Sequence, residues 1–485
     1  MEPGDVSRRL ETARLLRERG IQPYRKRFPR THSAAEVVQR WDTLAEVAVA
    51  GRVKALRGHG KAVFADLVDD SGKIQIYLKA DHLGGEKFDL LSLVDVGDIV
   101  GVRGSVFKTR RGEISVLVDD FEILTKALRD PPEKFHGLRD VELRYRRRYL
   151  DLAANPGVKA NFALRSRIIR CIRNLLESRG FMEVETPMMQ PVPGGALARP
   201  FVTHHNALDV ELFLRVAPEL YLKRLAVGGF EKIFEINRNF RNEGVSTKHN
   251  PEFTMLELYQ AYADYNDMME LTEELVFSVV NEVCGGTTVE YQGSKLDFAR
   301  PWKRITWLGA VKEYAGLEPE LDAGAEELGA LARGAGVQCD PGEKRGKILD
   351  RLFSTLVEPH LVQPVFILDY PVEISPLARR RDDQPLLTER FELYVHGFEV
   401  ANAFSELTDP VEQKLRFEHQ EELRRGGDAE AHAFDRDFLT ALEYGLPPTG
   451  GLGIGMDRLV MLLTDSPSIR DVIFFPLLRP EQPRD

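Results

Sequence analysis

The 485-residue sequence predicts an α+β protein, in which a small closed β-barrel precedes a larger antiparallel-rich sheet flanked by helices. This prediction rests on two different patterns of apolar residues along the chain. Between residues 45 and 125, short apolar runs alternate with turn residues, as in a series of short strands. Beyond residue 130, long segments with helical spacing alternate with single strands. A proline-containing segment at residues 130–134 separates the two patterns.

Strands of the barrel are expected at residues 47–51, 63–68, 74–78, 99–106 and 114–118, with turns at 58–60, 70–72 and 111–112. So many strands in a segment of ~80 residues are typical of a barrel of the OB type, which commonly binds single-stranded nucleic acid. We place this barrel at residues 45–129, after an N-terminal basic helical arm (1–44) and before a linker (130–157).

The larger unit is expected to span residues 158–485. It begins with a helix whose apolar positions follow helical spacing and which ends at Gly180. Strands of its sheet are expected at 181–187, 232–240, 252–262, 365–368, 391–395 and 398–404. Residues 305–360, rich in Leu, Ala, Gly and Glu, are interpreted as a helical insertion without chemistry.

Composition narrows the class of protein. The fractions of hydrophobic (43%) and charged (29%) residues are those of a globular protein, and no stretch approaches the ~18 apolar residues of a membrane helix. Residues 1–20 lack the apolar block of a signal peptide. Cys171, Cys284 and Cys339 lie far apart without a CxxC pair, which argues against zinc or a disulfide framework. We therefore expect a cytoplasmic protein without a membrane partner.

The net charge of −10 at first sight disfavours a nucleic-acid partner, but binding depends on local patches. Residues 1–30 carry nine basic and four acidic side chains, and a second basic run occupies residues 144–149. Taken alone, each run is better interpreted as a solvated face. The rest of the chain is therefore strongly acidic, which indicates a cationic substrate or carboxylates that bind a metal.

The most informative string covers residues 234–259. It predicts a strand, a turn and a second strand, on which Phe253, Glu257 and Tyr259 share one face because side chains alternate across a sheet. The guanidinium of Arg241 suits a phosphate or a carboxylate, and an exposed Phe offers a stacking surface for a base. A salt-bridged hairpin would explain any single residue, but not the whole string.

A second string, residues 390–407, contains Asn402, Phe404 and Glu406 at the same strand parity, so the three are expected to line one pocket. Glu392 and Glu399 are candidate ligands of Mg²⁺, which prefers hard oxygen ligands. Strict alternation places Glu399 on the opposite face from Asn402. If Glu399 belongs to the site, the strand therefore needs a bulge or twist.

A third string, residues 450–459, is rich in glycine and places Arg458 near the start of an apolar helix. The spacing is not GxGxxG, and no βαβ unit surrounds it, so a dinucleotide site is not indicated. A Walker A loop is also absent from the sequence. If ATP binds, arginines and a metal are expected to hold it.

These strings resemble motifs 1, 2 and 3 of the class II aminoacyl-tRNA synthetases: the helix and strand ending at Pro187, the loop at residues 240–243, and the glycine string ending in Arg458. Within that family, residues 193–196, 217–223 and 249–253 resemble the bacterial lysine enzymes. The aspartate and asparagine enzymes share the barrel and motif 2 but differ at these strings. The resemblance implies a class II catalytic domain at 158–485 that joins lysine to tRNA(Lys), with ATP as a substrate.

Roles at the nucleotide end follow from the resemblance. Arg241 would be the catalytic residue that holds the α-phosphate and the lysine carboxylate. Phe253 would stack under adenine and Glu243 would contact its amino group, while the distal phosphates would meet His249 and Arg458. The carboxylates Glu392 and Glu399 would bind Mg²⁺, with up to three ions per subunit.

The resemblance also assigns residues that recognise lysine and tRNA. The lysine ammonium would be received by Glu219, Tyr259 and Glu406, because a buried ammonium needs paired carboxylates. The lysine site would be completed by Gly195, Glu257, Asn402 and Phe404. Anticodon-reading positions of the barrel would be Phe64, Gln75 and Glu113. Motif 1 implies a homodimer.

Two alternatives remain at this point. A paralogue that lysylates a protein would have no use for an intact anticodon-type barrel. A catalytically dead RNA-binding protein should have lost motif residues, yet Arg241, Glu243, Phe253, Glu392, Glu399 and Arg458 are all present.

Overall fold

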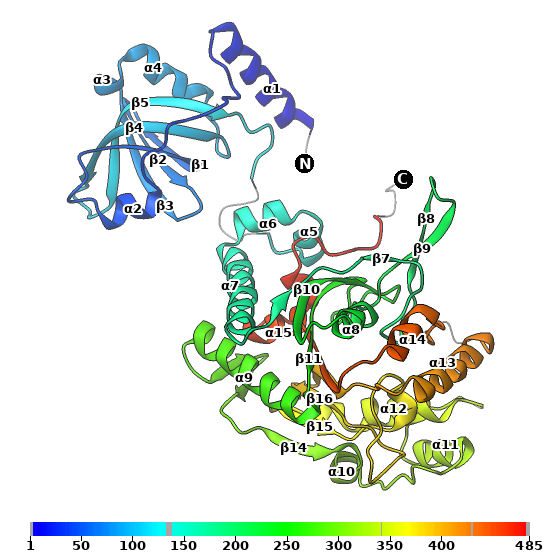
Figure 1. Cartoon of the computed structure of the whole chain (residues 1–485). Coiled ribbons are helices and arrows are strands. Elements are labelled where there is room, and N and C mark those ends of the chain that lie inside the picture. Colours follow the sequence, from blue (N-terminus) through cyan, green and yellow to red (C-terminus); the bar gives the residue numbers. More distant parts are fainter. Residues whose placement is uncertain (1–2, 132–137, 341, 428–429, 482–485) are drawn as a thin grey trace. The chain divides into compact units, whose positions relative to one another are not determined.

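The computed structural model describes residues 3–131, 138–340, 342–427 and 430–481 (Figure 1). The chain divides into two compact units, Met1–Asn155 and Pro156–Asp485. Residues 132–137 of the expected linker lie outside the described residues. The later part of that linker forms two short helices, α5 (Val141–Arg146) and α6 (Arg148–Ala154).

The first unit contains the expected closed barrel, with strand order β1-β2-β3-β5-β4. Its strands are β1 (Glu46–His59), β2 (Ala62–Val68), β3 (Lys73–Lys79), β4 (Ile99–Lys108) and β5 (Ile114–Thr125). Ile74, Ile76 and Leu78 point into the barrel core, whereas Gln75 and Tyr77 alternate with them on the outside. Between β3 and β4 lie α3 (Ala80–Leu83), α4 (Gly85–Asp89) and η1 (Leu90–Leu93).

The N-terminal arm forms α1 (Pro3–Glu18) and α2 (Ala34–Gln39). Arg9 of α1 is buried and donates to the backbone oxygens of Val96, at 3.1 Å, and Ala127, at 3.0 Å. Arg148, in the second basic run, is also buried and pairs with Asp151 at 2.6 Å. The interpretation of both runs as solvated faces is therefore wrong for these two arginines, because carbonyl and carboxylate partners compensate their burial.

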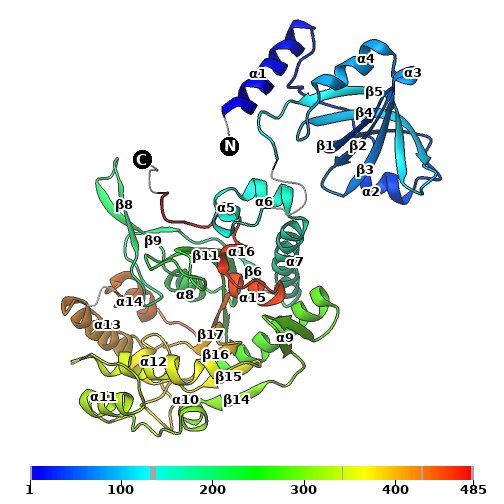
Figure 2. The ribbon, with the colours of Figure 1, turned by 180° about the vertical axis from the view of Figure 1, so that it is seen from behind.

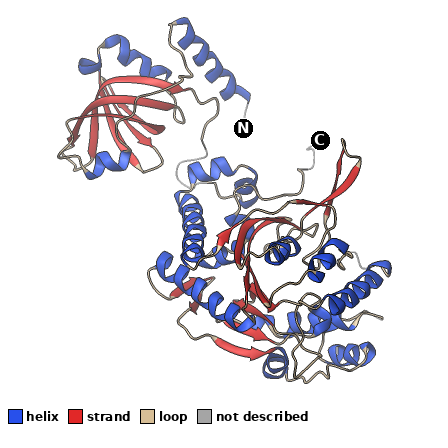
Figure 3. Ribbon diagram, in the orientation of Figure 1, coloured by secondary structure: helices blue, strands red, loops and turns tan. Residues whose placement is uncertain are grey.

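The second unit is organised around an eight-stranded sheet with strand order β14-β15-β16-β17-β18-β11-β10-β6 (Figure 3). Only the pairs β14–β15 and β6–β10 are parallel, which confirms the expected antiparallel-rich sheet. The strands are β6 (Met182–Glu183), β10 (Lys232–Phe240), β11 (Glu252–Ala261), β14 (Lys303–Thr306), β15 (Val365–Leu368), β16 (Arg390–Val395), β17 (Phe398–Ser405) and β18 (Thr449–Gly455).

Two elements of this sheet differ from the sequence prediction. The strand expected at 181–187 shortens to β6, and the glycine string forms β18, a central strand between β17 and β11. Glycine is a poor strand former, so sequence reasoning did not find this strand. Its position is set by hydrogen-bonded neighbours on both sides.

Helices cover the two faces of the sheet differently (Figures 1 and 2). The helices α7 (Pro156–Ser178), α9 (Tyr265–Cys284) and α15 (Met456–Leu463) pack on one face, where Leu256, Leu258 and Leu452 join the main hydrophobic core. On the other face, Leu222 of α8 (Glu219–Val227) contacts Tyr259. Residues of odd number on β11 therefore point to the α8 side, where a pocket opens.

The remaining elements surround this unit. Residues 305–360 are mainly helical, with α10 (Trp307–Ala310), a π-helical turn (Val311–Ala315), α11 (Ala325–Gly334), α12 (Arg345–Leu356) and η3 (Glu358–His360). Their core also includes Ile367 and Tyr394 of the sheet. The other elements are β7 (Met189–Gln190), β8 (Phe201–His205), β9 (Val210–Leu214), β12 (Thr288–Tyr291), β13 (Ser294–Asp297), η4 (Val372–Ile374), α13 (Pro410–Arg425), α14 (Arg436–Glu443) and α16 (Ile469–Val472).

Within the described ranges, none of the helices combines the length and the apolar composition that crossing a membrane requires.

Candidate active site

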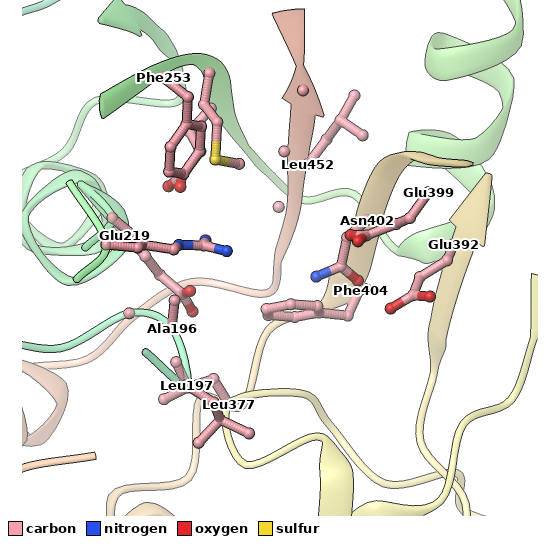
Figure 4. A pocket seen from close by; sticks show the side chains of 18 of the residues that line it. Ala196, Leu197, Glu219, Phe253, Leu377, Glu392, Glu399, Asn402, Phe404 and Leu452 are labelled. Atoms are coloured by element: carbon pink, nitrogen blue, oxygen red, sulfur yellow. The ribbon is translucent and has the colours of Figure 1, made fainter. Parts of the chain in front are cut away.

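A cavity of about 310 Å³ opens on the α8 side of the sheet, a size in the range of roughly 300–1,000 Å³ typical of small-molecule sites. It brings together all the residues that the sequence predicts for the substrates and the metal. They are Gly195, Glu219, Arg241, Glu243, His249, Phe253, Glu257, Tyr259, Glu392, Glu399, Asn402, Phe404, Glu406 and Arg458. Asn402 and Phe404 point from β17 toward the side where Glu219 lies (Figure 4). The side chains that alternate onto one face of β11 and of β17 meet in one site because β18 joins these two strands in the sheet.

Arg241 follows β10 and lies over the aromatic ring of Phe253, with the guanidinium carbon 5.0 Å from the ring centre. Its Nε is buried, and no hydrogen-bond partner for that atom exists in the part of the chain that the structure describes. Burial lowers the pKa of Arg241 from its ordinary value. An unpaired buried guanidinium donor is costly unless an anion binds to it, so this end of the pocket is suited to a phosphate or a carboxylate.

Arg458, at the start of α15, lies beside Glu399 and His249. Its Nη1 donates to the backbone oxygen of Glu399 at 2.7 Å and to its carboxylate at 3.1 Å, and its Nη2 is 3.5 Å from Nε2 of His249. Burial and then the charge of Arg458 lower the pKa of His249. The imidazole is therefore neutral at neutral pH and adds a hydrogen-bonding group beside the two cationic arginines.

The bulge required by Glu399 is present. Leu393 pairs with Ala401, whereas Tyr394 pairs with Glu399, so that Val400 is the extra residue on β17. This irregularity returns Glu399 to the pocket side, where Asn402 also lies. The conditional prediction of a bulge is therefore confirmed.

Glu392 is held from three directions. The hydroxyls of Tyr370 and Tyr394 donate to its Oε2 at 2.8 and 2.7 Å, and Arg390 donates to its Oε1. Burial raises the pKa of Glu392, and the charge of Glu399 acts in the same sense. Two close carboxylates that repel each other form a suitable donor set for a hard divalent cation. No group of three or more candidate metal ligands occurs in the described ranges, so such an ion would need further oxygens from a substrate.

The opposite end of the pocket is strongly acidic. Glu219, Glu257 and Glu406 are all buried, and burial followed by the charge of Glu219 raises the pKa of Glu257 to about 8. The hydroxyl of Tyr259 lies 3.5 Å from the Glu257 carboxylate. Glu406 Oε1 is buried without a hydrogen-bond partner among the residues described. An acceptor in this state indicates that a cationic ligand group belongs here.

One residue of this end was missed by sequence reasoning. Lys223 is buried, and its Nζ donates to Glu219 at 2.6 Å and forms an ion pair with Glu406. The available signal was the spacing of Glu219 and Lys223, which places both on one face of a helix. The pairing with Glu406 joins segments far apart in the sequence and carries no such signal.

Gly451 of β18 forms the floor beneath Glu406. A Cβ at this position would lie 2.0 Å from Glu406 Oε1 and 2.8 Å from a ring carbon of Tyr259. Gly195 is also required, because its φ is +92° and a Cβ there would lie 3.0 Å from the Cβ atoms of Ala217 and Glu219. The glycines therefore allow close packing around the acidic end, and they do not cradle a phosphate.

The barrel carries a separate group of predicted residues. The ring of Phe64 stacks on Tyr77, with ring centres 4.4 Å apart and planes at 15°, so one face of Phe64 is covered. Gln75 Oε1 accepts from Ser115 Oγ at 2.9 Å, which leaves the amide nitrogen as a donor. Glu113 is exposed and pairs with Lys73 at 3.3 Å. An aromatic ring beside polar groups on a barrel surface is suited to unpaired bases.

Comparisons with known proteins match both units of the chain. Residues 140–479 match the family of class II tRNA synthetases (D, K and N), and residues 47–124 match the OB-fold nucleic acid binding domain. The chain belongs to the class II tRNA synthetases of this D, K and N family.

Within this class, three similar proteins carry the same name. The chain is 59% identical to the lysine–tRNA ligase of Pelotomaculum thermopropionicum over 98% of its own length and 94% of that protein. It is 58% identical to the lysine–tRNA ligases of Carboxydothermus hydrogenoformans, with 98% of both chains covered, and Moorella thermoacetica, with 98% and 97% covered.

Proposed function

We propose that this protein is a lysine–tRNA ligase, which activates lysine with ATP to lysyl-adenylate and transfers it to tRNA(Lys). The observation that carries the proposal is the acidic end of the pocket, where Glu406 Oε1 is buried with no hydrogen-bond partner in the described part of the chain. At the other end, Arg241 lies over the ring of Phe253 and has a buried donor with no hydrogen-bond partner among the described residues. A substrate with a cationic tail and an anionic head satisfies both ends.

The pocket supports a reaction without a protein nucleophile. A carboxylate oxygen of lysine bonds to the α-phosphorus of ATP, and the bond from that phosphorus to pyrophosphate breaks. Arg241 holds both reacting anions and stabilises the charge that develops between them. Phe253 stacks on adenine, Glu243 contacts its amino group, and His249 and Arg458 hold the distal phosphates.

Glu392 and Glu399 would hold Mg²⁺ together with oxygens of the ATP phosphates, because their mutual repulsion suits a divalent cation. When bound, Mg²⁺ supplies charge neutralisation at the phosphates. Arg390 and the hydroxyls of Tyr370 and Tyr394 orient Glu392, so its carboxylate enters the site in one defined position.

Transfer requires recognition of tRNA(Lys), which we assign to the barrel residues Phe64, Gln75 and Glu113. We further propose that the protein works as a cytoplasmic homodimer. Three free cysteines support the cytoplasmic location. The exposed Met182 on the edge strand β6 supports the homodimer, since an exposed apolar edge favours association with a second chain.

The proposal is tested by ATP–pyrophosphate exchange with each of the twenty amino acids in turn. Lysine is expected to stimulate exchange strongly, because its side chain ends in an ammonium group that can pair with Glu406. Equal exchange with aspartate or asparagine would contradict the assignment. Charging of tRNA(Lys) in the same preparation separates this function from lysylation of a protein.

Phe64→Ala is expected to raise the KM for tRNA(Lys) and leave tRNA-independent lysine activation unchanged. Loss of one base stack costs about 1–3 kcal/mol, a roughly 5- to 150-fold effect on tRNA binding. Aminoacylation at graded tRNA concentrations and pyrophosphate exchange are measured on the same variant. Phe64→Tyr, which retains a ring, is the matched control. A parallel fall of both reactions would show that the barrel only supports the fold.

Gly451→Ala is expected to weaken lysine binding without a matching effect on ATP. The added Cβ meets Glu406 Oε1, so the carboxylate must move away from the substrate ammonium. We expect the KM for lysine to rise about 10-fold, the effect of losing one well-placed charged hydrogen bond at ~1.5 kcal/mol. Initial rates of exchange at varied lysine and varied ATP measure the two constants. An unchanged lysine KM would show that Gly451 does not position Glu406.

A further inference from the structure

An ammonium group of the protein lies beside the acidic end of the pocket, paired with two of the carboxylates that line it. Lys223 extends from α8, its side chain is 1% exposed, and its Nζ lies between the carboxylates of Glu219 and Glu406. The rings of Phe404 and Phe438 flank it, with centres 5.5 and 5.9 Å from Nζ. Because the side chain is buried, its charge must be compensated by partners inside the protein.

The charged groups around Lys223 come from several elements, and Glu235 of β10 also acts on Glu257. Glu219 lies on α8, Glu257 and Tyr259 on β11, and Glu406 directly after β17. His432 is buried next to this group, and burial followed by the charge of Lys223 lowers its pKa to about 4, so it is neutral. Arg390 acts on Glu219 from β16, and Arg215 and Arg241 act on Glu257.

The charges of this group match the proposed substrate. Burial raises the pKa of Glu219 and of Glu406, and the charge of Lys223 acts in the opposite sense on both. Burial also acts to lower the pKa of Lys223, but Glu219 and Glu406 outweigh it, and the pKa is raised. When a cationic ligand offsets the burial and ionises all three carboxyls, three carboxylates and one resident ammonium leave two negative charges, equal to the two ammonium groups of free lysine. The lysine carboxylate is matched separately by Arg241.

We propose that Lys223 is a specificity-determining residue, a resident counter-cation that stays in place during binding and keeps Glu219 and Glu406 ready for the substrate ammonium. This inference rests on the proposed lysine specificity. Its ion pair with Glu406 engages Oε2, whereas Oε1 has neither an ion pair nor a hydrogen bond among the described residues and is left for the substrate. Specificity for a dication then follows from charge balance as well as from pocket length.

An alternative role for Lys223 predicts the opposite change in lysine affinity. If the Lys223 ammonium occupied the place of the substrate ammonium and had to leave before lysine binds, its removal would tighten lysine binding. A resident counter-cation predicts weaker binding, because its removal leaves buried carboxyls that take up protons in the empty pocket.

The test is Lys223→Met in ATP–pyrophosphate exchange, with the KM for lysine measured from pH 6.5 to 8.5. Without the Lys223 charge, the pKa of both carboxyls rises further, so at neutral pH lysine must displace protons to bind. The ratio of variant to wild-type KM is expected to be about 10- to 100-fold at pH 6.5, the range for one charged hydrogen bond, and to fall as pH rises. The ratio cancels the titration of free lysine, and the KM for ATP should stay within about twofold of wild type.

Two further variants separate charge from packing. Arg224→Met removes the next cation of α8, which pairs with Asp435 and Asp437 outside this group, and should leave the lysine KM and its pH dependence unchanged. Lys223→Ala should regain tighter lysine binding when propylammonium is added, whereas propylammonium should only inhibit the wild type. Rescue tests the charge even if Lys223→Met folds poorly.

A lower or unchanged lysine KM in Lys223→Met would overturn the inference, as would a pH-independent increase together with no rescue of Lys223→Ala. These outcomes are distinct from a failure of the proposed function, in which the wild type itself would show no lysine-dependent exchange.

Discussion

Arg241→Ala is expected to abolish lysyl-adenylate formation while the protein remains folded. The guanidinium lies over Phe253 with a buried donor that has no partner among the described residues, so it is free to act on the charge that develops at the α-phosphorus. Loss of one such preorganised contact typically costs ~10²–10³ in rate. The rate of pyrophosphate exchange at saturating lysine and ATP measures the loss.

The control for this variant is Arg238→Ala. Arg238 lies three residues earlier on β10, is 38% exposed and is 3.6 Å from Glu252, so its removal should have little effect on exchange. Thermal unfolding of both variants checks that the fold is retained. If Arg241→Ala exchanges at a near-normal rate, Arg241 does not act on the reacting phosphate.

Glu406→Gln is expected to raise the KM for lysine by roughly 10²-fold, while the KM for ATP changes little. The substitution keeps the shape of the side chain but removes a buried negative charge, and breaking one partner of a buried ion pair costs about 3 kcal/mol or more. Both the substrate ammonium and Lys223 lose this partner. Exchange kinetics at varied lysine and varied ATP separate the two constants.

Glu412→Gln is the matched control for this carboxylate. Glu412 on α13 pairs with Arg380 and Arg416, each at 2.6 Å, and does not line the pocket. It should alter stability without a selective effect on lysine. If Glu406→Gln instead lowered the affinity for both substrates equally, Glu406 would support the pocket without recognising the ammonium.

Much of the candidate site could be predicted from local patterns. The alternation of side chains places Phe253, Glu257 and Tyr259 on one face of β11, and Asn402 and Phe404 on one face of β17. The structure shows all five in the same pocket. Even the bulge at Val400, directly after Glu399, was predictable, because the parity of Glu399 conflicts with that of Asn402. These features depend on the backbone period of single strands.

Other features depend on partners far away in the sequence. The sequence indicates a surface charge at Arg9, because nothing near Arg9 in the chain reveals that Val96 and Ala127 will accept its hydrogen bonds. Likewise β18 could not be predicted from its glycines. It is a strand because β11 and β17 bond to its two edges and because Glu406 and Tyr259 leave no room for a side chain at Gly451.

The sequence by itself determined the two-unit plan, the parity of the strands and the residue types suited to phosphate, ammonium and base, since these follow from local periodicity and the chemistry of single side chains. Only the tertiary structure decided the balance of charge. Glu219 and Lys223 are neighbours on one helix, but Glu406 reaches them through the order of strands in the sheet. Because electrostatic energy depends on distance in space and on burial, the role of Lys223 emerges only when the sheet is assembled.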